Sequence, residues 1–195
     1  MEKTKTKHSV GKPKHITTAS GIKFYPFKPN SNDIDIHDGA QALAMQARFS
    51  GHTKWKGKMK HYSVGQHSLY VSYICPFPLW GLVHDLPEAY SVDVPTPIKV
   101  RMPDFKIMED KIERSIAIKW NLPWPRPLEV KEADIAAFNI EWALLMQNDK
   151  RTKAYKKGMK DEKFLEILNY TMEETRDAFI ARFEELTKEK IEIIE

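Results

Sequence analysis

Residues 79–93 place an ionisable pair, His84 and Asp85, inside a segment whose apolar residues recur with helical spacing. The apolar positions are Leu79, Leu82, Val83 and Leu86, a period that predicts a helix packed against the core. Burying an unpaired carboxylate costs several kcal/mol, whereas a divalent metal ion would neutralise both groups at once. On such a helix His84 and Glu88 share a face, and Asp85 lies about 100° away, within reach of the same ion. The segment therefore predicts part of a metal site.

Further segments carry a helical period, and proline marks the loops that join them. The predicted helices cover residues 36–48, 62–74, 103–120, 128–148 and 161–190. We expect Asp35 to cap the first of these helices, a short hairpin about Gly21, an extended loop over 94–97 and a loop over 150–160. There is little strand signal. The sequence therefore predicts an all-α bundle of about six helices with Pro-rich connecting loops.

The chain has 195 residues, enough for one domain with a sizeable core. We expect this domain to span residues 16–195, preceded by a disordered basic tail over residues 1–15. That tail holds five lysines and one acidic residue, so it accounts for the whole net charge of +4. The basic balance is therefore weak evidence for a nucleic-acid partner, which we do not expect.

Compartment is indicated by cysteine usage and by hydropathy. The single cysteine, Cys75, excludes an internal disulfide and suits a reducing compartment, so we expect a cytoplasmic protein. No apolar run reaches the roughly 18 residues that span a bilayer. The lysine-rich start has no apolar stretch after it and is not a secretory signal.

Two ligands hold a metal ion weakly, so other segments must contribute. His67 and Asp134 lie on predicted helices that are otherwise apolar. Taken singly, His67 is better explained as a hydrogen-bonded core histidine, and Asp134 as an exposed acid near a helix N-terminus. Taken with His84 and Asp85, they form a mixed nitrogen and oxygen site that suits Co, Mn, Zn, Fe, Ni or Mg.

These four residues, in this order, resemble the metal-binding set of the HD-domain superfamily of metal-dependent phosphohydrolases. The resemblance extends to the segments "HYSVGQHSLYVS", "HDLPEAYSVDVPTPIK" and "VKEADIAAF", and to the stretch from "ITTASGIKF" to "ARFSGHT". The resemblance covers about residues 16–140. Over this range the chain is similar to bacterial deoxyribonucleoside 5′-nucleotidases and phage dATP triphosphohydrolases. It implies an HD-domain helical bundle, located in the host cytoplasm if the chain is phage-encoded.

The resemblance implies a division of roles around the metal ion. His67, His84, Asp85 and Asp134 would hold the ion, which would act as a Lewis acid and lower the pKa of a bound water. Glu88 would be the catalytic acid or base, and Asp93 would position the attacking water.

Other positions match substrate contacts of the superfamily. Arg48 matches a phosphate-binding arginine, whose planar fork suits bidentate contact, and Lys99 matches a second phosphate contact. Phe49 stands where relatives often carry a tryptophan that shapes the pocket for sugar and base. This departure leaves the base preference open.

The substrate could be a mono- or a triphosphate. A triphosphohydrolase must neutralise about four negative charges, so it needs cations beyond Arg48. Lysines alternate between Arg48 and His67, at Lys54, Lys56, Lys58 and Lys60, and Lys99 and Arg101 add to them. We therefore expect a dNTP triphosphohydrolase, with dATP as the first substrate and Lys54 and Lys56 as phosphate ligands. A dNMP 5′-nucleotidase is the alternative, and the lysine run could also be a solvated loop.

One alternative belongs to another functional class. A non-catalytic nucleotide- or nucleic-acid-binding module would use Trp55, Tyr62 and the lysines without the metal set. Relatives in the superfamily form dimers or larger rings, so we expect a homo-oligomer, a dimer or a hexamer. The last predicted helix, with Phe179 and Phe183, could form that interface or pack on its own domain.

Overall fold

The computed structural model describes residues 14–192, with side chains as far as Lys188. Residues 1–13 of the predicted basic tail lie outside the described residues. The described chain forms nine α-helices and two two-stranded antiparallel sheets, so the predicted all-α class is confirmed. The α-helices are α1 (Ile36–Met45), α2 (Val64–Ile74), α3 (Pro78–Val83), α4 (Thr96–Lys99), α5 (Pro103–Lys119), α6 (Leu128–Glu141), α7 (Lys153–Gly158), α8 (Glu162–Leu168) and α9 (Met172–Glu192).

Short elements complete the fold. Two hairpins are formed by β1 (Ile16–Thr17) with β2 (Lys23–Phe24) and by β3 (Lys54–Trp55) with β4 (Lys58–Met59). The 3-10 helices are η1 (Ser31–Asp33), η2 (Arg48–Gly51) and η3 (Leu86–Tyr90), and η4 (Trp142–Gln147) is a π-helix.

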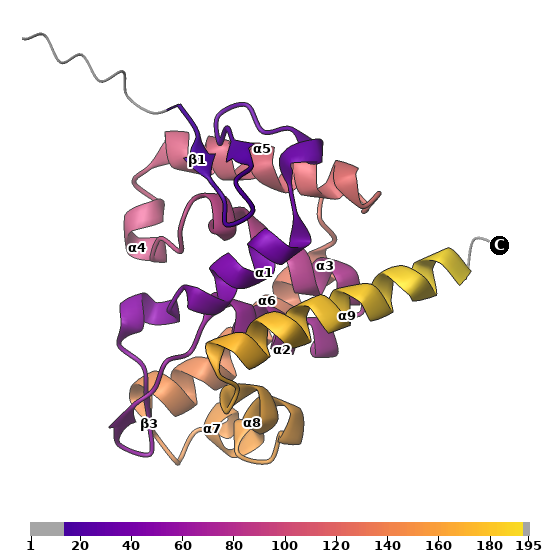
Figure 1. Cartoon of the computed structure of the whole chain (residues 1–195). Helices are drawn as coiled ribbons and strands as arrows, with labels where there is room; N and C mark the ends of the chain where they lie inside the picture. The colour runs from indigo at the N-terminus through magenta and orange to yellow at the C-terminus, as the bar shows by residue number, and fades with distance from the viewer. Residues whose placement is uncertain (1–13, 193–195) are drawn as a thin grey trace, which may run out of the picture.

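The core is built around α2, which packs against α1, α3, α6 and α9 (Figure 1). The long helix α9 crosses the molecule and covers α1, α2 and α3. Helix α5 and the β1–β2 hairpin lie at one end, and α7, α8 and the β3–β4 hairpin lie at the other. The largest fully buried side chains are Trp80, Tyr62, Tyr70, Phe24, Phe164 and Phe179. Among residues 14–192, no helix has both the length and the apolar character to cross a bilayer.

Several predicted local features are confirmed. The Asp35 carboxylate accepts hydrogen bonds from the backbone N–H groups of His37 and Asp38 and so caps α1. The hairpin about Gly21 pairs Ile16 with Phe24. Helix α5 ends one residue before its predicted end.

The predicted helix through His84 and Glu88 is wrong. Helix α3 ends at Val83, Asp85 has a non-helical backbone (φ −100°, ψ 7°), and η3 begins at Leu86. Pro87 explains the break, because its ring would clash with the carbonyl of Val83 in a continuous helix and it has no N–H to donate. His84 and Glu88 therefore do not share one helical face.

Other boundaries also differ from the prediction. The predicted loop over 150–160 contains α7, and the predicted helix over 161–190 is divided into α8 and α9. The division has a local cause: Thr171 and Glu174 bond reciprocally to each other's backbone N–H, a capping box that starts a new helix. The expected lysine loop is the β3–β4 hairpin, which turns at Lys56 and Gly57, both with positive φ. The expected extended loop over 94–97 runs into α4.

Close packing of α2 against α3 depends on Gly81. A Cβ atom there would lie 2.9 Å from the Cys75 Cβ atom and 3.1 Å from the Ser72 Cα atom. Only a glycine lets the two backbones approach to this distance. Because His67 lies on α2 and His84 directly follows α3, this approach brings the two imidazoles together.

Candidate metal centre

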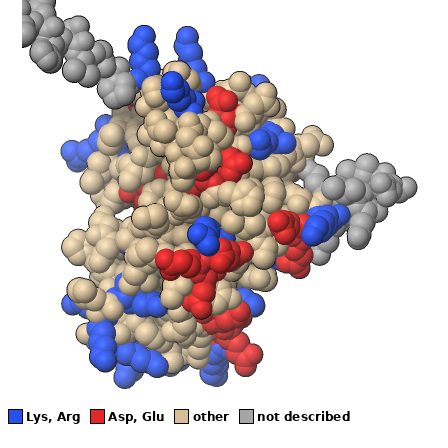
Figure 2. Space-filling view, in the orientation of Figure 1, with Lys and Arg blue, Asp and Glu red and all other residues tan. Residues whose placement is uncertain are grey.

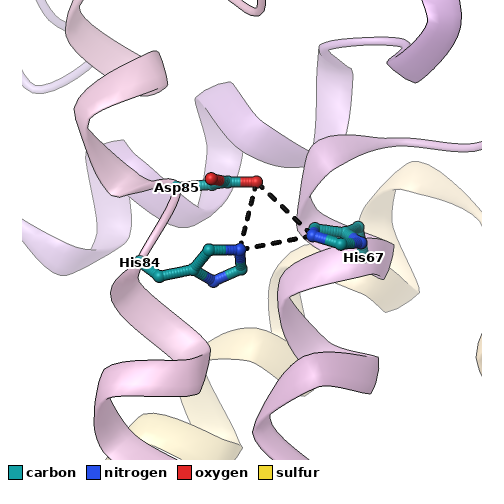
Figure 3. Close-up of side chains that lie close together, drawn as sticks. All are labelled: His67, His84 and Asp85. Carbon is teal, nitrogen blue, oxygen red and sulfur yellow. Dashed lines mark hydrogen bonds and ion pairs between the residues drawn. The ribbon is translucent and has the colours of Figure 1, made fainter. Parts of the chain in front are cut away.

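Four side-chain atoms converge between α2, α3 and α6. The Nε2 atoms of His67 and His84 are 3.3 Å apart, and the Oδ2 atom of Asp85 lies 3.6 and 3.3 Å from them (Figure 3). The Oδ1 atom of Asp134 lies 3.1 Å from the His67 Nε2 atom and 3.9 Å from the His84 Nε2 atom. Ligand atoms held about 2.1 Å from one ion are about 3.0 Å apart in octahedral and about 3.4 Å apart in tetrahedral geometry. The two imidazole nitrogens and the Asp85 oxygen therefore match the spacing of ligands around a single ion. The Asp134 oxygen has this spacing to the two nitrogens but lies outside the compact group of three.

Both histidines are oriented for coordination through Nε2. The Nδ1–H group of His84 donates to the carbonyl of Gly81 over 2.8 Å, and the Nδ1–H group of His67 donates to Glu141 Oε1 over 2.6 Å. Because a carbonyl oxygen only accepts, a neutral His84 carries its proton on Nδ1 and leaves a lone pair on Nε2. Burial and Arg48 would lower the pKa of His67, but Glu141 and Asp134 raise it to about 10, so in the absence of a metal ion a proton on His67 Nε2 separates the two nitrogens. A metal ion would replace that proton. This donor set fits a divalent metal ion.

Glu141 is a site residue to which the sequence reasoning gave no role. Its buried carboxylate accepts the His67 bond and a 3.0 Å bond from the Tyr62 hydroxyl, and lies 3.3 Å from the Arg48 Nε atom. Burial alone would raise the pKa of Glu141, but His67 and Arg48 hold it below its ordinary value. The signal in the sequence was its position seven residues after Asp134, on the same otherwise apolar helical face.

Arg48 lies beside the cluster, as the resemblance implied for a phosphate ligand. Its Nη1 atom is 3.4 Å from Asp85 Oδ2. Burial would lower the pKa of Arg48, but Glu141 and Asp85 outweigh it and raise the pKa. The guanidinium therefore stays charged next to the candidate ligands.

Glu88 and Asp93 lie on the segment that follows the His-Asp pair. Glu88 is buried, its Oε1 atom is 3.6 Å from Lys99 Nζ, and its Oε2 atom has no hydrogen-bond partner among the described residues. Burial, with Asp85 and Asp93 nearby, raises the pKa of Glu88. The sequence reasoning missed Gln46, whose side chain donates to the carbonyl of Glu88 and accepts from the N–H of Asp93. Gln46 therefore fixes this segment relative to α1.

A charged cleft of about 200 Å³ opens beside the cluster. Five acidic and three basic residues line it together with His84 and Pro87. Each basic side chain is paired with a carboxylate on α5: Lys99 with Glu109 at 3.0 Å, Lys106 with Asp110 at 3.2 Å and Arg126 with Glu113 at 3.1 Å. The positive charge of the cleft is therefore locally neutralised.

Phe49 lies on η2, and Lys54 and Lys56 lie in the β3–β4 hairpin, outside the cluster of candidate ligands. The Phe49 ring contacts Phe138 and Trp142, with centroids 5.8 Å away in both cases. Lys54 and Lys56 lie in the β3–β4 hairpin, which packs on η4, and neither forms an ion pair with a described residue. Figure 2 shows Lys and Arg side chains gathered over this hairpin at the lower left. The structure therefore gives these lysines no direct contact with the four candidate ligands.

Two relatives are found among known proteins. The chain is 34% identical over 176 residues to the uncharacterized protein YfdR of Escherichia coli, a match that covers 89% of this chain and 96% of the relative. It is 30% identical over 131 residues to an uncharacterized protein of Rhodobacter capsulatus, covering 62% of this chain and 65% of the relative. No protein-family model matches the chain. Neither relative's name states an activity, so the chemistry must be argued from the residues of the site.

Proposed function

The chain belongs to the same family as YfdR of Escherichia coli, and we propose that it is a divalent-metal-dependent phosphohydrolase of deoxynucleotides, of the HD-domain type. The observation that carries this proposal is the convergence of the His67 and His84 Nε2 atoms and the Asp85 Oδ2 atom at 3.3–3.6 Å from one another, with Asp134 Oδ1 at 3.1 and 3.9 Å from the two nitrogens. His67, His84, Asp85 and Asp134 would hold the ion. When bound, a divalent ion supplies Lewis acidity toward a phosphate oxygen and lowers the pKa of water.

The residues around the cluster have the chemistry that phosphoester hydrolysis needs. The planar guanidinium of Arg48 reaches the edge of the cluster and can bind two phosphate oxygens at once. Glu88 holds a carboxylate oxygen without a described partner, free to bind the attacking water or to protonate the leaving oxygen. Asp93, fixed through Gln46, would position that water.

We propose two candidate substrate classes, dNTPs and dNMPs. The lysine run favours a dNTP, dATP first, and a triphosphohydrolase would release the deoxynucleoside and triphosphate. The charges at the cluster favour a dNMP, because acidic residues outnumber basic ones in the adjoining cleft and each basic side chain there is already paired. A dianionic monophosphate is repelled less by this surplus than a tetra-anionic triphosphate.

A combined metal and product assay tests the proposal. We expect the purified protein to retain a divalent metal ion and to release phosphate from dNMPs, or triphosphate from dNTPs, in a chelator-sensitive manner. Asp85→Ala should lose metal and turnover together, whereas Glu88→Ala should keep the metal and lose turnover. Asp177→Ala, which removes an exposed acid on α9, is the control and should change neither.

Two outcomes would contradict parts of this reasoning. A protein that binds nucleotides without metal or phosphate release would be the non-catalytic module instead. Loss of the metal in Glu88→Ala would refute the role given to Glu88. Repeating the product assay with each of the four dNMPs and the four dNTPs identifies whether the substrate is a mono- or a triphosphate.

A further inference from the structure

A second cavity, of about 1030 Å³, lies between the β1–β2 hairpin and α5, at the end of the molecule where these two elements meet (Figure 1). One wall is the hairpin with the turn that follows it, and the other is formed by the end of η3 and the start of α5. Pockets that bind small molecules measure roughly 300–1,000 Å³, so this cavity is large enough for one. We call it the hairpin cavity.

Aromatic and apolar side chains make up most of the lining of the hairpin cavity. Phe105 and Met108 lie three residues apart on one face of α5 and border the cavity together with Tyr90 of η3. Tyr25 and Phe27 border it from the hairpin side. Rings on both walls favour a ligand with a flat apolar body, because aromatic groups gain most from stacked or edge-to-face contact.

A tight turn holds two of these rings out of the core. The N–H of Lys28 donates to the carbonyl of Tyr25 over 2.9 Å, and Pro26 occupies the second position of the turn, which proline favours. The side chains of Phe27 and Tyr25 are consequently 67% and 42% exposed, although both border the cavity. An apolar ligand in the cavity would cover both rings.

The charged side chains of the hairpin cavity are basic. Lys14 and Lys28 are exposed at the cavity, and neither forms an ion pair with a described residue. His15 also borders the cavity, and no acidic residue of the described chain does. The charged cleft beside the metal centre is the opposite case, because acidic residues outnumber basic ones there. An anionic group on the ligand would therefore complement the hairpin cavity.

The start of the chain itself complements the hairpin cavity poorly. Residues 1–13 hold four lysines and one acidic residue, so they carry the same sign of charge as Lys14 and Lys28. A separate anionic molecule matches the cavity better than this segment does.

We propose that the hairpin cavity is a binding site for a small molecule with a flat apolar body and one anionic group. The site is separate from the proposed phosphohydrolase centre: Phe105 and Met108 border the hairpin cavity, whereas Glu109 and Glu113 of the same helix line the charged cleft. Tyr90 follows Glu88 by two residues, so the bound molecule would contact the segment that carries the proposed catalytic acid.

Fluorescence titration of the full-length protein with two matched probes tests the proposal. The probe 8-anilinonaphthalene-1-sulfonate has aromatic rings and one sulfonate, and N-phenyl-1-naphthylamine has the same rings without the charge. We expect one sulfonate probe to bind per chain, more tightly than the neutral amine. Phe27→Ala should raise the Kd of both probes about 2- to 10-fold, because one ring contact is lost. The double variant Lys14→Gln, Lys28→Gln should raise the Kd of the sulfonate probe alone, also about 2- to 10-fold.

The control variants lie on the exposed strand β4. Met59→Ala removes an apolar side chain and Lys58→Gln removes a basic one, and neither should change the Kd of either probe. Failure of the wild-type protein to bind the sulfonate probe would overturn the inference. Unchanged affinities in Phe27→Ala, or equal weakening of both probes in the double lysine variant, would overturn it as well. None of these outcomes bears on the phosphohydrolase proposal.

Two further measurements distinguish other occupants of the hairpin cavity. Displacement of the bound sulfonate probe by a synthetic peptide of residues 1–13 would make the start of the chain the occupant and would refute the inference. Sedimentation tests a second copy of the chain: if the wild-type protein is oligomeric and Phe27→Ala makes it monomeric, the cavity is a contact between copies and the inference fails. We expect no displacement and the same oligomeric state in both proteins.

Discussion

Replacing Glu141 by glutamine tests whether a buried carboxylate outside the four candidate ligands sets their affinity for metal. The substitution keeps the size of the side chain and removes its charge. Glu141 then loses its ion pair with Arg48. The amide oxygen can still accept the hydrogen bonds from His67 and Tyr62, because both reach Oε1, but the amide NH₂ group then takes the place of Oε2 and faces the Arg48 Nε–H group.

The expected magnitude follows from these contacts. Removing one partner of a buried ion pair costs about 3–5 kcal/mol, and we expect the lower end because glutamine keeps one acceptor. For a chain of this size, about 3 kcal/mol corresponds to a Tm about 6–12 °C lower. A hydrogen-bond partner of a metal-binding histidine contributes about 10- to 100-fold to metal affinity, so we expect Glu141→Gln to weaken metal binding within that range.

The measurement is thermal unfolding of the metal-free protein and titration with Mn²⁺ or Co²⁺. Because a metal ion at this site would bind the folded state, the rise in Tm with metal concentration would report affinity independently of turnover. The matched control is Glu132→Gln, the same change at an exposed position on the same helix. If Glu141→Gln binds metal as tightly as Glu132→Gln, then Glu141 does not orient His67 for coordination and the reasoning is wrong.

Two predictions concern the packing around the site. Gly81→Ala should destabilise the protein by about 1–3 kcal/mol, because the new Cβ atom meets the backbone of α2. It should also weaken metal binding by moving His84 away from His67. Urea unfolding and metal titration measure these two effects, and no change in either would contradict the role given to the close approach of α2 and α3. Burial would raise the pKa of Asp38, but hydrogen bonds from the Ser20 hydroxyl, from Thr18 and from the Ser20 N–H outweigh it and hold the pKa below its ordinary value. Its stabilising effect is therefore present above the unfolded pKa of about 3.9 and is lost as pH falls through the folded value. The urea midpoint of Asp38→Asn should lie below that of the wild-type protein at pH 7, and the gap should close below about pH 4; a gap that persists at pH 2 would refute the assignment.

The fold class and the candidate ligands were accessible from the sequence for the same reason. A long apolar period such as that of residues 103–120 predicts a helix strongly, and α5 follows it closely. A histidine or aspartate on such a face, as at His67 and Asp134, stands out because it needs a partner. The structure brings these side chains together, while their roles in hydrolysis stay a prediction.

Three features were missed from the sequence because they depend on competing local backbone preferences and on tertiary packing. The apolar period continued across Pro87, so the helix was extended through His84, although proline ends it at Val83. Glu141 looked like an ordinary helical acid because its three partners come from segments far away along the chain. The π-helix η4 also has no periodic signature that separates it from the end of α6.

The glycine contact between α2 and α3 has a consequence for which ions the centre accepts. The two imidazole side chains are 0% and 1% exposed and lie at a close backbone crossing, whereas the carboxylates of Asp85 and Asp134 are 19% and 37% exposed. We therefore expect the carboxylates of Asp85 and Asp134 to move when ions of different radius bind, while the two imidazole nitrogens keep their positions. Selection among divalent metals would then depend on their preference for two nitrogen ligands more than on their size.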